Sequence, residues 1–381
     1  MRRILFPAKK RTWILCLVLL CMSAVFLNAQ KVHAGGSVPR PSGSLNVTRK
    51  VLAKGKSLQL VYSGEEEVVS WKSKKKSRAT VSTKGKVKAV GQGKVVIQAV
   101  LDSGAVAECT LTVRAKAKST AARTGKGHWK NQYGERYYVF PDGSMLTGSC
   151  PIGGSYYVFD ANGALQRPAK TSVIKPGKKY YLVSPSGKAL SGWRVVGNNL
   201  YYAGSNGVVK RNTTYEGISF GAKGAAKKSA AATYQKTIVE TVNRICSEDM
   251  TREEKLYACW KYVTNSNSFS YYIWPYMVGD DGWVRKSAWQ LLETGRGDCY
   301  NFACAFAAMA GVVGYKAYVV YGRVSGTRDH AADGLTRHAW VKINGLYYDP
   351  EAEWANWYRG VYGEESYDLR HQVLENYLFS E

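Results

Sequence analysis

Pairs of adjacent tyrosines recur along the middle of this 381-residue chain, and they constrain its fold more than any other feature. The pairs stand 19, 24 and 21 residues apart, at Tyr137-Tyr138, Tyr156-Tyr157, Tyr180-Tyr181 and Tyr201-Tyr202. A glycine follows each pair after five or six residues, which is typical of a strand that turns into the next one. Units this small cannot bury a core alone, so they must stack. The sequence therefore predicts a solenoid of β-hairpins over residues 126–212.

Tryptophans stand eight residues before the first and the last tyrosine pair, at Trp129 and Trp193. With the tyrosine pairs, they make this region resemble the cell-wall-binding repeats of choline-binding proteins and clostridial surface proteins. In that family, aromatic side chains of neighbouring hairpins cage a quaternary ammonium by cation–π attraction. The middle two units lack a matching Trp, so the aromatic residues either bind a wall ligand or only stack the hairpins. The candidate wall-ligand residues are Trp129, Tyr137, Tyr138, Tyr156, Tyr157, Tyr180, Tyr181, Trp193, Tyr201 and Tyr202.

Residues 43–115 contain short runs rich in β-branched residues, broken by Gly and Ser turns. Their alternation of apolar and polar residues predicts an antiparallel β-sandwich. The runs Trp71-Lys-Ser73, Ala79-Thr-Val81 and Gly85-Lys-Val87 resemble the bacterial Ig-like domain of group 2. The basic residues between Lys72 and Arg78 are either a polymer-binding edge or an ordinary solvated loop.

Three motifs near the C-terminus supply a nucleophile, a base and a group to orient the base. They are Gly297-Asp298-Cys299, His338-Ala-Trp340 and Tyr348-Asp349-Pro350. Asp298 is placed to cap a helix that starts at Cys299 and runs to Gly314. A thiol on the first turn of a helix meets free N–H groups and the positive end of the helix dipole, which favour a thiolate and an oxyanion.

The length of a hairpin turn decides whether His338 and Asp349 lie on the same face of the sheet; we call this dependence hairpin parity. Residues 338–343 alternate as a strand, and Asn344-Gly345 is a strong signal for a two-residue turn. With that turn, Ile343 faces Leu346, and His338 and Asp349 project from one face as diagonal neighbours. A three-residue loop would put Asp349 on the other face.

On these three motifs, residues 233–381 resemble the transglutaminase-like superfamily, whose papain-like α+β fold carries Cys on a helix and His and Asp on adjoining strands. The resemblance implies that Cys299 is the nucleophile, His338 the general base and acid, and Asp349 the orienting group. No cofactor or metal is implied. The chain departs from the family at Gly314-Tyr-Lys-Ala-Tyr318, where Gly-x-Pro-x-Arg is common. His330 is the rival base. Trp289, Tyr271 and Tyr272 either line the cleft, complete the oxyanion hole or, as we expect, pack in the core.

The net charge of +26 is divided unevenly along the chain. Residues 35–124 hold 18 basic and 5 acidic residues, and residues 125–228 hold 15 and 4, whereas residues 229–381 hold 15 and 19. Residues 1–34 read as a basic, then apolar, secretory signal peptide that ends in Val32-His33-Ala34, and its removal would leave no stable membrane span. Outside a cell, we expect a basic chain to be attracted to an anionic wall polymer or membrane rather than to nucleic acid.

The remaining organisation follows from composition. Residues 213–232 include a run of small and basic residues and read as a linker. The six cysteines after the signal are too scattered for a disulfide framework or a zinc site, and burial is expected for all but Cys299.

Together these features predict a multidomain, secreted, wall-associated protein of the Gram-positive type. We expect a cysteine hydrolase that cleaves amide bonds of a peptide or protein at the envelope through an acyl-thioester, with teichoic-acid-like polymers, with or without choline, as partners. A crosslinking transamidase with the same triad is the second hypothesis, since acceptor choice depends on cleft shape. A non-catalytic surface adhesin is the third.

Overall fold

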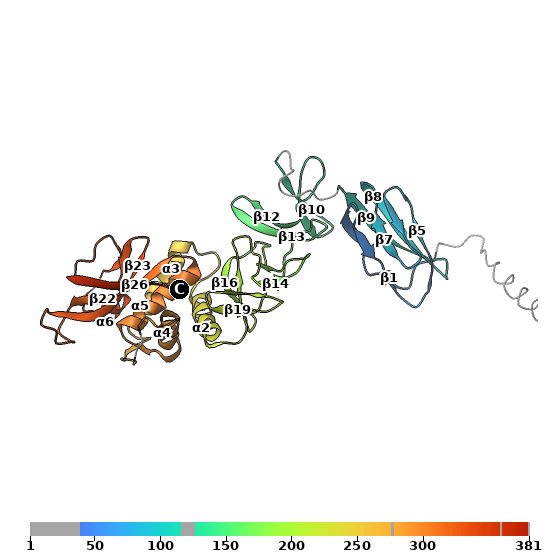
Figure 1. Ribbon diagram of the computed structural model, residues 1–381. Coiled ribbons are helices and arrows are strands. Elements are labelled where there is room, and N and C mark those ends of the chain that lie inside the picture. Colours follow the sequence, from blue (N-terminus) through green and yellow to red (C-terminus); the bar gives the residue numbers. More distant parts are fainter. Residues whose placement is uncertain (1–38, 116–125, 276–277, 359, 380–381) are drawn as a thin grey trace, which may run out of the picture. The chain divides into compact units, whose positions relative to one another are not determined.

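The computed structural model describes residues 39–115, 126–275, 278–358 and 360–379 (Figure 1). The chain divides into two compact units, residues 1–50 with 57–112 and residues 51–56 with 113–381. No helix within the described residues is both long and apolar enough to cross a membrane. The predicted signal peptide, residues 1–34, lies outside the described residues.

The N-terminal region is a β-sandwich, as predicted. Its strands are β1 (Ser44–Leu45), β2 (Arg49–Ala53), β3 (Ser57–Gln59), β4 (Tyr62–Ser63), β5 (Val68–Ser73), β6 (Ala79–Val81), β7 (Lys86–Ala89), β8 (Gly93–Leu101) and β9 (Val106–Arg114). They form a four-stranded sheet in the order β2-β9-β8-β5, a three-stranded sheet β3-β7-β6 and the pair β1-β4. Alternate residues of β8 and β9 are buried, because successive side chains of a strand point to opposite faces.

A series of two-stranded antiparallel hairpins follows, also as predicted. The hairpins are β10 (His128–Gln132) with β11 (Glu135–Val139), β12 (Gly148–Ile152) with β13 (Ser155–Phe159), β14 (Ser172–Ile174) with β15 (Tyr181–Val183), and β16 (Gly192–Val196) with β17 (Asn199–Ala203). The tyrosine pairs lie in the second strand of each hairpin or, for Tyr180, just before it. Bridges such as Tyr137 to Ala164 and Tyr157 to Lys188 join consecutive hairpins, so the units stack.

The segment expected to be a linker contains one more hairpin, so the linker prediction is wrong for its first part. Strands β18 (Thr213–Tyr215) and β19 (Ile218–Phe220) pair with each other. The small-residue run is also ordered, since the N–H of Ala226 donates to the carbonyl of Leu200 at 2.9 Å. This hairpin carries a single tyrosine, Tyr215, in place of a tyrosine pair. The hairpin repeats therefore continue beyond the last tyrosine pair that marks them in the sequence.

The fifth hairpin belongs to the core of the C-terminal domain. Ile218 and Phe220 are 0% and 1% exposed, and they share one apolar cluster with Trp193 and with the helices that follow. Those helices are α2 (Ala230–Ile245), α3 (Arg252–Val263), α4 (Trp283–Thr294), α5 (Cys299–Val313) and the short α6 (Pro350–Ala355). The hairpin therefore covers apolar surface that the helices alone would leave exposed.

The C-terminal domain sets the helix α5 against an antiparallel sheet. The sheet has the order β25-β24-β23-β22-β26 and contains β22 (Ala317–Ser325), β23 (Leu335–Ile343), β24 (Leu346–Tyr348), β25 (Tyr362–Glu364) and β26 (His371–Leu378). Two short strands form a parallel pair: β20 (Ser270–Tyr271), which precedes α4, and β21 (Arg296–Gly297), which leads into α5. The small alanine side chains of α5 are almost all buried, which lets the helix lie in the middle of the domain.

Candidate active site

Cys299 is the first residue of α5 and is held there by a capping box. The side chain of Asp298 accepts from the N–H of Tyr300 at 3.1 Å, and Asn301 Oδ1 accepts in return from the N–H of Asp298 at 3.0 Å. Asn301 Nδ2 also donates to the carbonyl of Ser287 in α4 at 2.9 Å. The predicted cap is thus confirmed, and these bonds fix the turn that presents the thiol. Cys299 is only 1% exposed.

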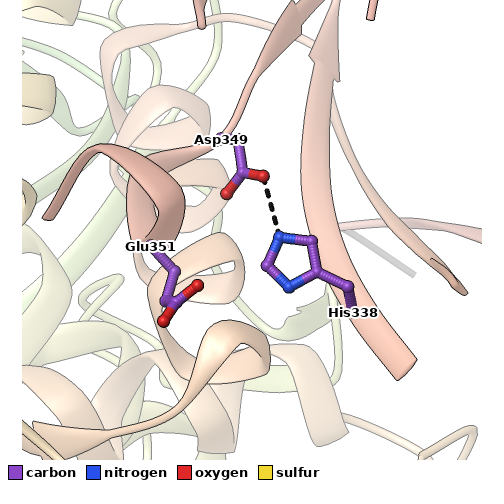
Figure 2. A group of neighbouring side chains, drawn as sticks. All are labelled: His338, Asp349 and Glu351. Carbon is purple, nitrogen blue, oxygen red and sulfur yellow. Dashed lines mark hydrogen bonds and ion pairs between the residues drawn. The ribbon is translucent and has the colours of Figure 1, made fainter. Parts of the chain in front are cut away.

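His338 and Asp349 meet across the hairpin of β23 and β24, as parity predicts. The register pairs Ile343 with Leu346, and Asn344 and Gly345 form the turn with φ values of 54° and 88°. A hydrogen bond of 2.8 Å joins His338 Nε2 to Asp349 Oδ2 (Figure 2). Both side chains are buried.

Asp349 has two further partners that hold its carboxylate. The hydroxyl of Tyr367 donates to Oδ2 at 2.6 Å, and the N–H of Ala352 donates to Oδ1 at 3.1 Å as the first turn of α6 forms. The role of Tyr367 could not be read from the sequence, because it lies 18 residues after Asp349 in an irregular segment between β25 and β26. Its burial and its stacking on Trp340 at 5.1 Å give the hydroxyl a fixed position.

The electrostatics of the site favour a charged imidazole. Burial by itself lowers the pKa of His338, but the negative charge of Asp349, its hydrogen bond and the hydrogen-bonding side chain of Cys299 outweigh burial and raise that pKa well above its ordinary value. The thiol of Cys299 is thus a partner of the same ring that Asp349 orients. The structure brings together all three residues that the sequence predicts for the triad.

Glu351 adds a second carboxylate beside the imidazole. Ligand atoms of His338, Asp349 and Glu351 lie within 4.8 Å of one another, and Figure 2 shows both carboxylates coming from the start of α6. Burial raises the pKa of Glu351, and Glu351 Oε2 accepts from Trp357 Nε1 at 2.9 Å. Because the three groups already have hydrogen-bonding partners and Glu351 is biased toward its neutral form, this cluster fits a proton-holding role better than a cation site.

The other residues singled out in the sequence lie in different surroundings. Tyr271 and Tyr272 are 42% and 44% exposed, so the prediction that they pack in the core is wrong, because β20 is a short strand at the surface. Trp289 is half-buried and lies against Tyr234, with ring centroids 4.7 Å apart. His330, the rival base, is exposed in the loop between β22 and β23 with φ of 51°.

The cysteines outside the site are free and mostly buried within the described residues. Burial raises the pKa of Cys109 to about 12 and that of Cys304 well above its ordinary value. Cys246 is only half-buried, in contrast to the prediction, because it ends α2 at the edge of the domain. A hydrogen bond with Cys259 lowers the pKa of Cys246.

The candidate wall-ligand aromatics divide into two groups because strands alternate. Tyr137 and Tyr181 point inward and are buried at 0% and 8% exposure. Others gather around the two tryptophans. The ring centroid of Trp129 lies 5.3 Å from those of both Tyr138 and Tyr157. The ring centroid of Trp193 lies 5.1 Å from that of Tyr202 and 6.1 Å from that of Tyr215. The half-buried Tyr156, Tyr180 and Tyr201 lie along the same hairpins.

Each aromatic cluster already carries a basic side chain of the chain itself. The guanidinium of Arg136 lies 4.3 Å from the ring centroid of Trp129, and Lys210 Nζ lies 4.3 Å from that of Tyr215. Lys175 and Arg211 each lie 5.2 Å from the ring of Tyr180. The protein's own cations therefore already cover one face of Trp129, Tyr180 and Tyr215, where a quaternary ammonium would compete with them.

Fold and site define a multidomain protein with an Ig-like sandwich, β-hairpin repeats and an α+β domain built around a buried Cys, His and Asp. Comparison with known families then assigns the two ends of the chain. Residues 239–358 match the transglutaminase-like superfamily, and residues 41–121 match the bacterial Ig-like domain (group 2). The C-terminal domain is thus similar to a transglutaminase-like core.

Solved structures with hairpin repeats are also similar to this chain. Choline binding protein F from Streptococcus pneumoniae, solved with a peptidoglycan analogue, has 25% identity and a TM-score of 0.23, over 38% of this chain and 49% of that one. CbpJ from Streptococcus pneumoniae TIGR4 has 24% identity and a TM-score of 0.22, over 46% and 54%. The chain thus spans about half the length of these proteins. No curated protein sequence matches it.

Proposed function

We propose that the C-terminal domain is a cysteine hydrolase that cleaves amide bonds of a peptide or protein at the cell envelope. The observation that carries this proposal is the shared imidazole. His338 hydrogen-bonds to Asp349 at 2.8 Å and is also a partner of the Cys299 thiol at the start of a helix. A nucleophile, a base and an orienting group in one buried chain of contacts is the arrangement that acyl transfer needs.

The chemistry proceeds in two halves. The thiolate of Cys299 attacks the amide carbonyl, and the backbone N–H of Cys299, at the positive end of the α5 dipole, donates to the negative oxygen that forms. The His338 imidazolium gives its proton to the leaving amine, so that the C–N bond breaks and a thioester remains. His338 then takes a proton from water, which attacks the thioester, releases the acid and regenerates the thiol. Asp349 orients the ring and stabilises its charge throughout.

Transamidation uses the same first half and replaces water with a lysine amine. The triad serves both reactions equally, so the acceptor is decided by which molecule reaches the thioester. We favour water, and the experiment that tests the function scores the two acceptors side by side.

Attachment to the envelope is the second part of the proposal. Residues 35–124 and 125–228 carry net charges of +13 and +11, whereas residues 229–381 carry −4. A basic surface raises the local concentration of an anionic polymer, and the half-buried repeat aromatics supply additional contact area. The basic segments would therefore hold an acidic catalytic domain at a teichoic-acid-like wall polymer.

A peptide-library digest tests the catalytic proposal. The full chain and the Cys299→Ala variant are incubated with the library, with and without an added primary amine, and products are identified by mass spectrometry. New termini that depend on Cys299 support hydrolysis, and amine-linked products support transamidation. If wild type and Cys299→Ala give the same products, the domain is not an acyl-transfer enzyme on peptides. That outcome would favour the hypothesis of a non-catalytic surface adhesin.

A further inference from the structure

A guanidinium group joins the two sides of the candidate active site. Arg328, in the loop between β22 and β23, donates from Nη1 to the hydroxyl of Tyr271 at 3.2 Å. It also donates from Nη2 to the carbonyl of Arg337, the residue before His338. Tyr271 pairs in register with Gly297, two residues before Cys299. Arg328 therefore connects the strand of the base to the strand that leads into the nucleophile.

A partly exposed carboxylate, that of Asp329, fixes this guanidinium in place. Asp329 Oδ1 accepts from Arg328 Nε at 3.1 Å, while Asp329 Oδ2 accepts from the N–H and Nε of Arg337 at 2.7 and 3.1 Å. Burial acts to raise the pKa of Asp329, but these hydrogen bonds hold it well below its ordinary value, so the carboxylate stays charged. Two guanidinium groups thus share one carboxylate. A surplus positive charge remains here, although the domain as a whole is acidic.

Arg328 keeps the capacity to bind a further anion. A guanidinium has five N–H donors, and the contacts with Asp329, Tyr271 and Arg337 use three of them in the described part of the chain. One N–H on each Nη nitrogen remains, and the side chain is 38% exposed. The charge of Arg328 acts on the Cys299 thiol, and Tyr271, to which Arg328 donates, pairs with Gly297 in the short strand that leads into Cys299.

We propose that Arg328 binds a carboxylate of the acyl-donor substrate beside the bond that Cys299 attacks. A carboxylate accepts two parallel N–H bonds from one guanidinium, and the existing hydrogen bonds already hold that guanidinium in a fixed orientation. The site would then select peptides that carry an acidic side chain or a free C-terminal carboxylate next to the reacting carbonyl. This inference rests on the proposed function for its substrate, but the anion site itself can be measured without turnover.

Two alkylating reagents of nearly equal size test the anion site at Cys299. Iodoacetate is an anion and iodoacetamide is neutral, and with each the thiolate forms a C–S bond and expels iodide. In the full chain, the ratio of the iodoacetate to the iodoacetamide rate constant at Cys299 is expected to fall roughly three- to tenfold in Arg328→Gln and to recover in part in Arg328→Lys. Peptide mass spectrometry assigns the labelled cysteine.

Arg296 supplies the matched control. It is an exposed cation in β21, three residues before Cys299, with no ion pair among the described residues. Arg296→Gln should leave the ratio unchanged, because an exposed surface charge without an ion-pair partner is screened by water and salt. If Arg328→Gln leaves the ratio as it is in wild type, or if Arg296→Gln lowers it equally, Arg328 is not a carboxylate site.

Protection of Arg328 from phenylglyoxal gives a second readout that needs no reactive thiol. In the Cys299→Ala protein, N-acetylalanine offers a terminal carboxylate and N-acetylglutamic acid α-amide a side-chain carboxylate, with N-acetylglutamine amide as the neutral control. Slower modification of Arg328 with either acid supports the site and identifies the source of the carboxylate. Equal modification with all three compounds overturns it. Protection without peptide cleavage by wild type would reject the proposed function and retain the anion site.

Discussion

The imidazole of His338 is held from one side by a carboxylate that itself has a second donor. Asp349 Oδ2 is hydrogen-bonded to His338 Nε2 and accepts from the Tyr367 hydroxyl, while Oδ1 accepts from the N–H of Ala352 in α6. Because the carboxylate is satisfied on both oxygens, it stays in one orientation and imposes that orientation on the ring. The geometry of His338 and Asp349 thus depends on Tyr367. No described contact joins Tyr367 to Cys299 or to Arg328.

Replacing Asp349 with Asn should abolish most of the activity while the domain stays folded. The charge that raises the pKa of His338 would be lost, so burial would dominate and the ring would become neutral near pH 7. We expect kcat to fall by about a thousandfold or more, as for the equivalent change in other triads. Steady-state kinetics with an NMR titration of His338 measures both effects. An unchanged pKa in Asp349→Asn would contradict the electrostatic account.

Stability should also depend on pH through His338. Its folded pKa is raised above the unfolded value near 6.5, so its contribution to the free energy of unfolding is complete below that value. The contribution is lost as pH rises through the raised folded pKa. Urea unfolding of Cys299→Ser and Cys299→Ser/His338→Gln should therefore show a difference that shrinks as pH increases above 6.5. A difference that is constant or grows with pH would count against this sign.

The turn between β23 and β24 decides which face of the sheet Asp349 occupies. Asn344 and Gly345 both take left-handed backbone conformations, as a two-residue hairpin requires. The strand period of two then brings Asp349 to the face of His338, and the register Val341–Tyr348 follows from it. One residue more would turn the carboxylate away.

Inserting one glycine between Asn344 and Gly345 should therefore remove the hydrogen bond of His338 and Asp349. We expect activity to fall by at least a hundredfold, with circular dichroism close to wild type, because the strands can still pair. Insertion after Gly177, in an open loop of the repeats where a Cβ meets nothing within 4 Å, is the matched control. Equal activities of the two insertion variants would show that parity does not position the triad.

Local signals explain how far the sequence could predict these elements. The cap at Asp298 and the turn at Asn344 are set by neighbouring residues, so they could be read directly, and the structure has both. Tyr367 and Arg328 reach the site only through the sheet and its loops, which no local pattern encodes. The hairpin β18–β19 was missed because its apolar residues are spaced like a repeat, but the tyrosine pair that marks the others is absent.

At the scale of the whole molecule, charge is segregated from the candidate active site. The sandwich and the repeats carry the excess of positive charge, and the transglutaminase-like domain is mildly acidic. Such a distribution directs the long-range attraction of an anionic polymer to the basic segments rather than to the candidate active site. The aromatic clusters of the repeats add short-range contact, but Arg136 and Lys210 already lie over their rings.

Retention on purified cell walls should therefore respond to salt and resist choline. Raising the ionic strength from about 0.05 to 0.5 M should release most of the protein, because the Debye length falls well below 10 Å. Free choline at millimolar concentration should release little of the bound protein. Release by choline is expected only in the Arg136→Ala and Lys210→Ala variant, in which the cations over the aromatic clusters of Trp129 and Trp193 are removed. A pull-down of the Cys299→Ala full chain measures this. Release by choline but not by salt would show that the aromatic clusters, rather than charge, provide attachment.

The fifth hairpin has a consequence for how such chains are assembled in evolution. Trp193, Ile218 and Phe220 are part of the same apolar core as α2 and α5, so the last two hairpins belong to the folded core of the C-terminal domain. A recombination event that joined new N-terminal domains at residue 233 would leave the apolar face of α2 exposed and prone to aggregation. The heritable module must include β16 to β19, and relatives that exchange their other hairpins should keep these two together with the transglutaminase-like domain.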